Sequence, residues 1–156
     1  MKPDGGIVFI KDNDDKSYPI LISEAKNQGT NDLRAEEGLK KQAHGNAVER
    51  LGKNVIGFKT AVMFESIFPF VCFGYGCDFA DGCSIIDRVV TIAMFSELNV
   101  VRLHNEGASQ QVNRGSFFFR KEKWSETEMY NIMFDIADRS ILYYFSKYKQ
   151  ENFVTQ

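Results

Sequence analysis

Two short apolar runs near the start of the chain, separated by a polar segment, constrain the fold more than any other feature. The runs cover residues 5–10 and 18–23, and residues 11–16 between them are charged or polar. Two such runs joined by a short polar segment are typical of a β-hairpin. The sequence therefore predicts two antiparallel strands at the start of the chain.

Ionisable residues flank this predicted hairpin. Asp4 opens the first strand, and Glu24 and Lys26 end the second. Residues two apart on a strand share a face, so Glu24 and Lys26 should point the same way and Ala25 the opposite way. Two carboxylates beside a lysine suit a Mg²⁺ site, which takes one or two carboxylates, waters and a substrate phosphate. The alternative is a solvated strand end with a surface ion pair.

The composition indicates a globular chain and narrows its partners. The chain has 156 residues, of which 44% are hydrophobic and 26% are charged, which favours one folded domain over a disordered chain. The formal net charge of −2 excludes a generally basic protein that coats nucleic acid. It leaves open a sequence-specific DNA-binding protein with a local basic surface.

Cysteine usage and hydropathy point to the cytoplasm. Cys72, Cys77 and Cys83 form no CxxC pair, so free thiols are expected. No apolar run reaches the ~20 residues of a membrane span, and residues 1–6 lack the apolar core of a signal peptide. We therefore expect a cytoplasmic protein without membrane association.

The rest of the chain predicts helices alternating with short strands. Periodic apolar residues predict a long amphipathic helix, and an all-apolar run predicts a buried central strand. A Ser-x-x-Glu capping box starts the last helix. The expected helices cover about residues 43–66, 84–97 and 125–147, the expected strands 70–73, 99–103 and 116–119, and the expected loops 27–32 and 105–115. This order predicts an α/β fold with a mixed central β-sheet flanked by helices, in a single domain over residues 1–156.

Three segments of the chain resemble a known family. Residues 2–8, 24–29 and 45–50 closely resemble, in this order, the EcoRI family of type II restriction endonucleases. The match continues at Asn54 and at residues 68–71 and 132–136. The resemblance implies a restriction-endonuclease-like fold and membership of the PD-(D/E)xK nuclease superfamily.

The resemblance also implies a reaction and its catalytic residues. In that family the residues at the positions of Asp4 and Glu24 hold Mg²⁺, with the carbonyl of Ala25 as a further ligand. Lys26 is expected to orient the attacking water and to stabilise charge on the phosphate. The implied reaction is Mg²⁺-dependent hydrolysis of double-stranded DNA at a short palindrome, GAATTC-like, leaving a 3′-hydroxyl and a 5′-phosphate.

A second part of the resemblance concerns DNA recognition. Residues 45–50 resemble the family's recognition segment at the start of a helix aimed into the major groove. Asn46, Ala47, Glu49 and Arg50 are therefore expected to contact DNA, because Asn can bond adenine bidentately and Arg favours purine acceptors. Without the resemblance, Asn46 and Arg50 are ordinary polar positions at the start of a helix.

Arg88 resembles a further recognition arginine. In the family a second arginine follows three residues later, but this chain has Thr91 at that place. The contact to the outer base pair is therefore expected to differ. The alternative is that Arg88 is a solvated helix arginine.

The resemblance also implies partners. A two-fold homodimer matches a palindromic site by symmetry, and a cognate DNA methyltransferase is the expected companion. The chain begins at the metal-binding motif, so we expect that it lacks the N-terminal part found in the family. Two alternatives stay open, namely a truncated, catalytically silent DNA-binding remnant and a nuclease of the same superfamily without sequence preference.

Overall fold

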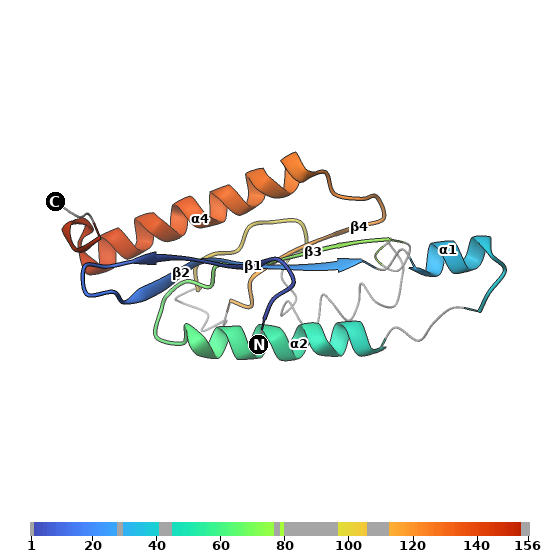
Figure 1. The fold of residues 1–156 in the computed structure, drawn as a ribbon, viewed down its shortest axis with the longest axis horizontal. Helices are drawn as coiled ribbons and strands as arrows, with labels where there is room; N and C mark the ends of the chain where they lie inside the picture. The colour runs from blue at the N-terminus through green and yellow to red at the C-terminus, as the bar shows by residue number, and fades with distance from the viewer. Residues whose placement is uncertain are drawn as a thin grey trace.

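The computed structural model describes residues 2–27, 30–40, 45–76, 79, 97–105 and 113–153. Figure 1 shows a sheet with helix α4 on one face and helix α2 on the other. This confirms the predicted α/β fold with a mixed sheet between helices. The elements are β1 (Gly6–Lys11), β2 (Ser17–Asn27), α1 (Thr30–Glu36), α2 (Gly45–Ala61), β3 (Phe70–Tyr75), β4 (Ser116–Arg120), α4 (Glu126–Tyr148) and the 3₁₀ helix η2 (Gln150–Asn152).

The described strands form one sheet in the order β1-β2-β3-β4. Strand β1 pairs antiparallel with β2, with Gly6 opposite Ser23, which confirms the predicted hairpin. Strands β2, β3 and β4 run parallel, so their carboxyl ends meet at one edge of the sheet. Ligands of open α/β sheets bind outside this edge.

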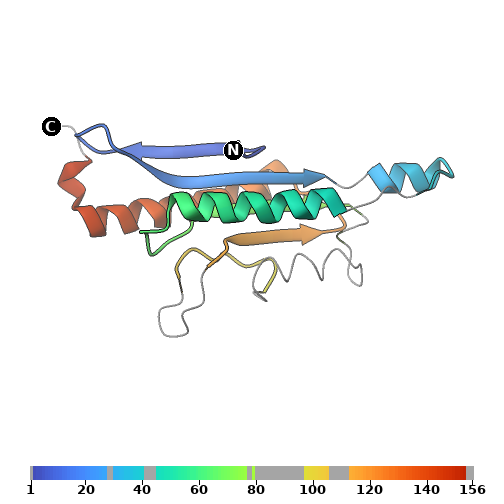
Figure 2. The same cartoon turned by 90° about the horizontal axis from the view of Figure 1, so that it is seen from below.

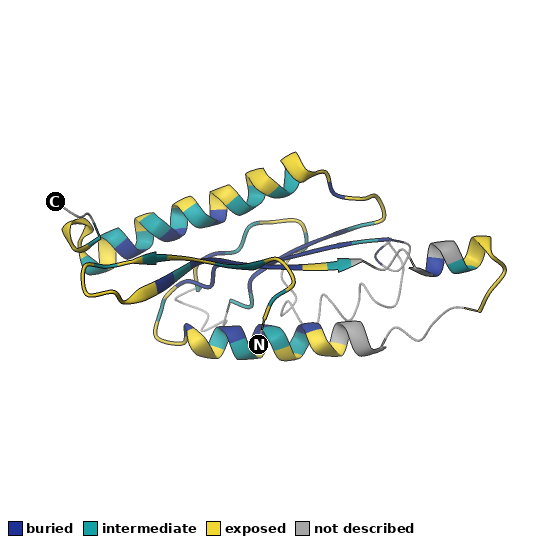
Figure 3. Ribbon diagram, viewed as in Figure 1, coloured by how far each residue is buried: buried dark blue, intermediate teal, exposed yellow. Residues whose placement is uncertain are grey.

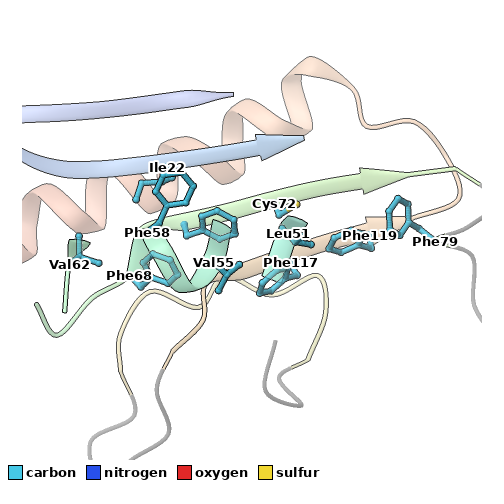
Figure 4. Close-up of a cluster of buried hydrophobic side chains, with 11 residues drawn as sticks. Ile22, Leu51, Val55, Phe58, Val62, Phe68, Cys72, Phe79, Phe117 and Phe119 are labelled. Carbon is cyan, nitrogen blue, oxygen red and sulfur yellow. The ribbon is translucent and has the colours of Figure 1, made fainter. Parts of the chain in front are cut away.

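The hydrophobic core has two layers because alternate residues of each strand point to opposite faces. Figure 4 shows the layer between the sheet and α2. Strand β3 is buried on both faces, as its all-apolar run predicts. Figure 3 shows the buried strands β3 and β4 between helices that are exposed on their outer sides. The α2 layer includes Ile22, Leu51, Val55, Phe58, Phe70 and Phe117, and the α4 layer includes Tyr18, Leu21, Val71, Phe73, Phe118, Trp124, Ile136 and Tyr144.

The helix predicted over residues 43–66 is shorter in the structure. Helix α2 ends at Ala61, and the chain then turns. The amide of Val62 donates to the carbonyl of Lys59, and the amide of Glu65 donates to the carbonyl of Val62. The apolar spacing continues through this turn because Val62 and Ile67 still pack in the core. Periodicity alone therefore overestimates the length of the helix.

The strand predicted over residues 99–103 is wrong. Asn99 adopts a positive φ of 63°, which a strand does not accept. Its side-chain carbonyl accepts from the amide of Phe119, and the hydroxyl of Ser116 accepts from the amide of Arg102. The segment therefore runs beside β4 through these side-chain hydrogen bonds and one backbone bond, from the Asn99 amide to the Phe117 carbonyl, and does not form a regular ladder.

The remaining sequence-based assignments have mixed outcomes. Residues 27–32 are not all loop, since Asn27 ends β2 and Thr30 begins α1. The strand predicted at 116–119 is β4, which lies at an edge of the sheet as expected. The capping box is present, because Ser125 Oγ accepts from the Glu128 amide while Glu128 accepts from the Ser125 amide. The helix predicted over residues 84–97 falls almost entirely outside the described residues.

No helix in the described part of the chain combines the length and the apolar character needed to span a bilayer.

We expect the α4 layer to contribute strongly to stability. Ile136 is 1% exposed, whereas Leu142 on the same helix is 59% exposed. Ile136→Ala should lower the free energy of unfolding by about 2–5 kcal/mol, because it removes buried methyl groups and leaves a cavity. Leu142→Ala, the matched control, should change it by less than about 0.5 kcal/mol. Urea denaturation measures both, and equal losses would contradict the assignment of this layer.

The contribution of Glu128, at the start of α4, to the stability of the fold should decrease at acid pH. Arg120 donates two hydrogen bonds to Glu128, of 2.8 and 2.7 Å. These hydrogen bonds are the main reason that the pKa of Glu128 is lowered to about 2, and hydrogen bonds from Ser125 are the second. A carboxylate whose pKa is lower in the folded state than in the unfolded state stabilises the fold at a pH above its unfolded pKa. This stabilisation is lost as the pH falls toward the folded pKa. Glu128→Gln should therefore be less stable than the wild type near neutral pH.

This difference between Glu128→Gln and the wild type should shrink between the unfolded pKa of about 4.5 and the folded pKa of about 2. Urea denaturation across this pH range measures it. Glu126→Gln, which removes a carboxylate from the same helical turn, is the control. A constant difference for Glu128→Gln at all pH values would contradict the assignment.

Candidate functional site

A glycine-containing turn before β1 places Asp4 beside the end of β2. The amide of Gly6 donates to the carbonyl of Pro3 at 3.3 Å, which closes the turn, and the amide of Gly5 donates to the carbonyl of Ser23 at 2.9 Å. A Cβ on Gly5 would lie 2.6 Å from Ser23 Oγ, so a larger residue would force the two strands apart. The turn thus holds the Asp4 carboxylate next to the strand that carries Glu24.

Lys26 bridges the two predicted carboxylates. Its Nζ lies 3.0 Å from Asp4 Oδ2 and 2.6 Å from Glu24 Oε1. The Glu24 side chain is 1% exposed, whereas that of Asp4 is 61% exposed. Ala25 is exposed, in keeping with the alternation of a strand. The structure therefore brings together Asp4, Glu24 and Lys26, which we call the Lys26 cluster.

The Lys26 cluster holds a charged lysine. Partial burial lowers the pKa of Lys26, but hydrogen bonds to Glu24 and Asp4 raise it by more, so that the pKa lies above its ordinary value. At neutral pH the side chain is therefore an ammonium group with donors directed at both carboxylates. An ammonium group at this position can stabilise negative charge on a bound anion.

Within the described part of the chain, one oxygen of Glu24 has hydrogen-bond partners and the other has none. Asn54 Nδ2 of α2 donates to Glu24 Oε1 at 2.9 Å, the same oxygen that contacts Lys26. Glu24 Oε2 is buried and has no hydrogen-bond partner among the described residues. A buried carboxylate oxygen without a partner is unfavourable unless a ligand satisfies it. The atom is therefore suited to a cation.

The donor set fits a hard cation better than a soft one. Carboxylate and carbonyl oxygens are the ligands of Mg²⁺, which keeps several waters and needs only one or two carboxylates. Cys72 lies opposite Glu24 in the parallel register, but burial and then the Glu24 charge raise the pKa of its thiol, so it stays protonated. Within the described ranges, no group of three or more His, Cys, Asp or Glu residues converges on one point. Asp4, Glu24 and the carbonyl of Ala25 are the residues that could hold a metal here.

The predicted recognition residues lie at the start of α2. Asn46 and Ala47 belong to its first turns, and their side chains lie outside the described part of the structure. Glu49 and Arg50 are exposed. Lys53 pairs with Glu49 at 2.7 Å on the helix surface and lowers its pKa. Figure 2 shows that β2 ends on the side of the molecule where α2 begins, so this segment and the Lys26 cluster share one end of the fold.

Two residues complete the comparison with the sequence-based predictions. Arg88 lies outside the described residues. Asn54 contacts Glu24 in the structure, but the sequence patterns predict no function for it. The sequence feature that could have indicated this contact is the position of Asn54 in the core-facing stripe of α2, between Leu51 and Phe58, where a polar side chain needs a partner.

A family model described as "Restriction endonuclease EcoRI" matches residues 1–84 and 80–151. The type II restriction enzyme EcoRI of Escherichia coli is 30% identical over 176 aligned positions, which cover 90% of this chain and 64% of that enzyme. The type II restriction enzyme RsrI of Cereibacter sphaeroides is 28% identical, with 90% of this chain and 63% of that enzyme covered.

The chain thus spans somewhat less than two thirds of the length of these two relatives. The family match nevertheless extends over nearly all of it. The chain belongs to the EcoRI family of restriction endonucleases.

Proposed function

We propose that this chain is a Mg²⁺-dependent endonuclease that cleaves double-stranded DNA at a short palindrome related to GAATTC. The observation that carries the proposal is the Lys26 cluster, with the unpartnered buried oxygen of Glu24, in a chain of this family. The two relatives are named type II restriction enzymes, which supports site-specific cleavage of DNA.

Each residue of the proposed site has a separate task. Asp4 and Glu24 hold the cation, with the carbonyl of Ala25 as a further ligand. Mg²⁺, when bound, lowers the pKa of a coordinated water and neutralises charge on the phosphate. Lys26, protonated in this environment, donates to a non-bridging phosphate oxygen and to the attacking water.

The proposed reaction is hydrolysis of one phosphodiester bond in each strand. The water oxygen forms a bond to phosphorus while the bond from phosphorus to the 3′ oxygen breaks. The 3′ oxygen takes up a proton, and a 3′-hydroxyl and a 5′-phosphate result. The proximity of the exposed Asp4 carboxylate and the buried Glu24 carboxylate, both in contact with Lys26, supports a reaction at the carboxyl end of β2.

Recognition is assigned to the start of α2. Asn46 and Arg50 read base edges in the major groove, with Ala47 and Glu49 beside them, and Arg88 contributes a further contact. The exposure of Glu49 and Arg50 supports this assignment, because buried side chains could not reach a groove. The proposal includes a homodimer whose symmetry matches the palindrome, a companion DNA methyltransferase that protects the same site, and a cytoplasmic location.

Substitutions in the Lys26 cluster should abolish cleavage. Asp4→Asn, Glu24→Gln and Lys26→Ala should each lower the cleavage rate at least about a hundredfold, because each removes a charge that acts on the transition state. Digestion of a plasmid with Mg²⁺, followed by sequencing of the ends, measures this. Lys11→Ala, which changes an exposed lysine at the other end of the hairpin, is the control and should cut normally.

The digest, together with a DNA-binding measurement on the wild type, separates the proposal from its alternatives. Cleavage that persists in Lys26→Ala would remove the role given to that residue. Specific DNA binding without cleavage by the wild type would instead identify a catalytically silent remnant. Equal cutting of matched and scrambled duplexes would identify a nuclease without sequence preference.

Substitutions in the recognition segment should relax sequence discrimination. Asn46→Ala and Arg50→Ala should each reduce the preference for the cognate site over a site with one changed base pair by about 1–3 kcal/mol, or about 5- to 150-fold. Competition binding at fixed salt measures the ratio. Thr60→Ala, near the other end of α2, should leave the ratio unchanged. A uniform loss of affinity for all sequences would indicate a phosphate contact.

A further inference from the structure

A half-buried polar side chain of α2, that of Asn54, is aimed at the proposed catalytic site. Asn54 lies in the same stripe as Leu51, Val55 and Phe58, which pack in the core layer under the sheet. Its amide nitrogen donates to Glu24 Oε1 across a separation of 30 residues in the chain. The contact therefore joins the helix that carries the recognition segment to the strand that carries the catalytic carboxylate.

The two oxygens of Glu24 have different surroundings, and Asn54 helps create the difference. Oε1 accepts from Asn54 at 2.9 Å and from Lys26 at 2.6 Å. Oε2 is buried, and no residue in the ranges that the structure describes forms a hydrogen bond with it. Two donors on one oxygen fix the rotation of the carboxylate about its last bond, because turning it would break both hydrogen bonds. The free oxygen is thus held in one direction.

A carboxylate held in this way is a better metal ligand than a mobile one. Outer partners that orient a metal ligand matter for affinity, and their loss typically weakens metal binding about 10- to 100-fold. Lys26 alone is a flexible donor on a long side chain, and it also contacts Asp4. Asn54 has a shorter side chain on a packed helix, so it supplies the more rigid of the two contacts.

We infer that Asn54 is a positioning residue for the metal site: it holds Glu24 Oε1 so that Oε2 faces the divalent cation. This inference rests on the proposed function, since it requires that Glu24 binds a metal. It assigns no contact between Asn54 and the cation, the DNA or the attacking water.

The test measures metal binding directly, without cleavage. The full chain is titrated with Mn²⁺, and free Mn²⁺ is followed by electron paramagnetic resonance. Asn54→Leu keeps the size of the side chain but removes the donor, and it should weaken Mn²⁺ binding about 10- to 100-fold. Asn54→Gln retains an amide donor and should recover part of this loss. Thr60→Ala on the same helix should bind as the wild type does.

A purely structural role for Asn54 predicts the opposite order. If Asn54 only fills space against the sheet, Leu should be tolerated and the longer Gln should be worse. Thermal unfolding of each variant shows whether it folds, so a loss of binding in a folded Asn54→Leu supports the inference. Wild-type Mn²⁺ affinity in a folded Asn54→Leu overturns it.

Glu24→Gln separates this inference from the proposed function. If the wild type binds Mn²⁺ and Glu24→Gln does not, the metal site stands, and only the Asn54 variants decide the inference. If Glu24→Gln binds Mn²⁺ as the wild type does, the metal role of Glu24 fails and the inference fails with it. In cleavage assays Asn54→Leu should raise the Mg²⁺ concentration needed for half-maximal rate more than it lowers the rate at saturating Mg²⁺.

Discussion

The burial of the Glu24 carboxylate is the constraint on which the site depends. A charged group in the interior is tolerated only with close partners, and Glu24 has Lys26 and Asn54. These two contacts come from the same strand and from a helix packed below it. The position of α2 under β2 is therefore coupled to the electrostatics of the site as well as to the apolar core.

Helix α2 connects the two halves of the proposed activity. Its start carries the segment assigned to base recognition, and its buried side contacts the sheet through Leu51, Val55 and Phe58. The aromatic rings of Phe58 and Phe70 stack with centroids 6.1 Å apart, which fixes the helix against β3. A helix held this rigidly is suited to present exposed side chains such as Arg50 at a defined distance from Glu24.

Local sequence patterns predicted most of the described elements, and the failures have identifiable causes. The hairpin, the buried strand β3 and the capped helix α4 follow from alternation, an all-apolar run and a Ser-x-x-Glu pattern, all of which act over a few residues. Residues 99–103 have strand-forming composition, but the positive φ of Asn99 and its hydrogen bond to the Phe119 amide prevent a ladder. Apolar periodicity likewise extended α2 beyond Ala61, because Val62 stays buried in the turn.

The sequence by itself determined that Glu24 and Lys26 share a face of one strand and that Asp4 precedes its partner strand, since the period of a strand and the reach of a hairpin are local properties. The resemblance to a nuclease family implied the roles of these residues in metal binding and catalysis. Only the tertiary structure decided that Asn54 contacts Glu24 and that the other carboxylate oxygen has no partner in the described part of the chain. That contact depends on the packing of α2 against parallel strands distant in the chain, which no local pattern specifies.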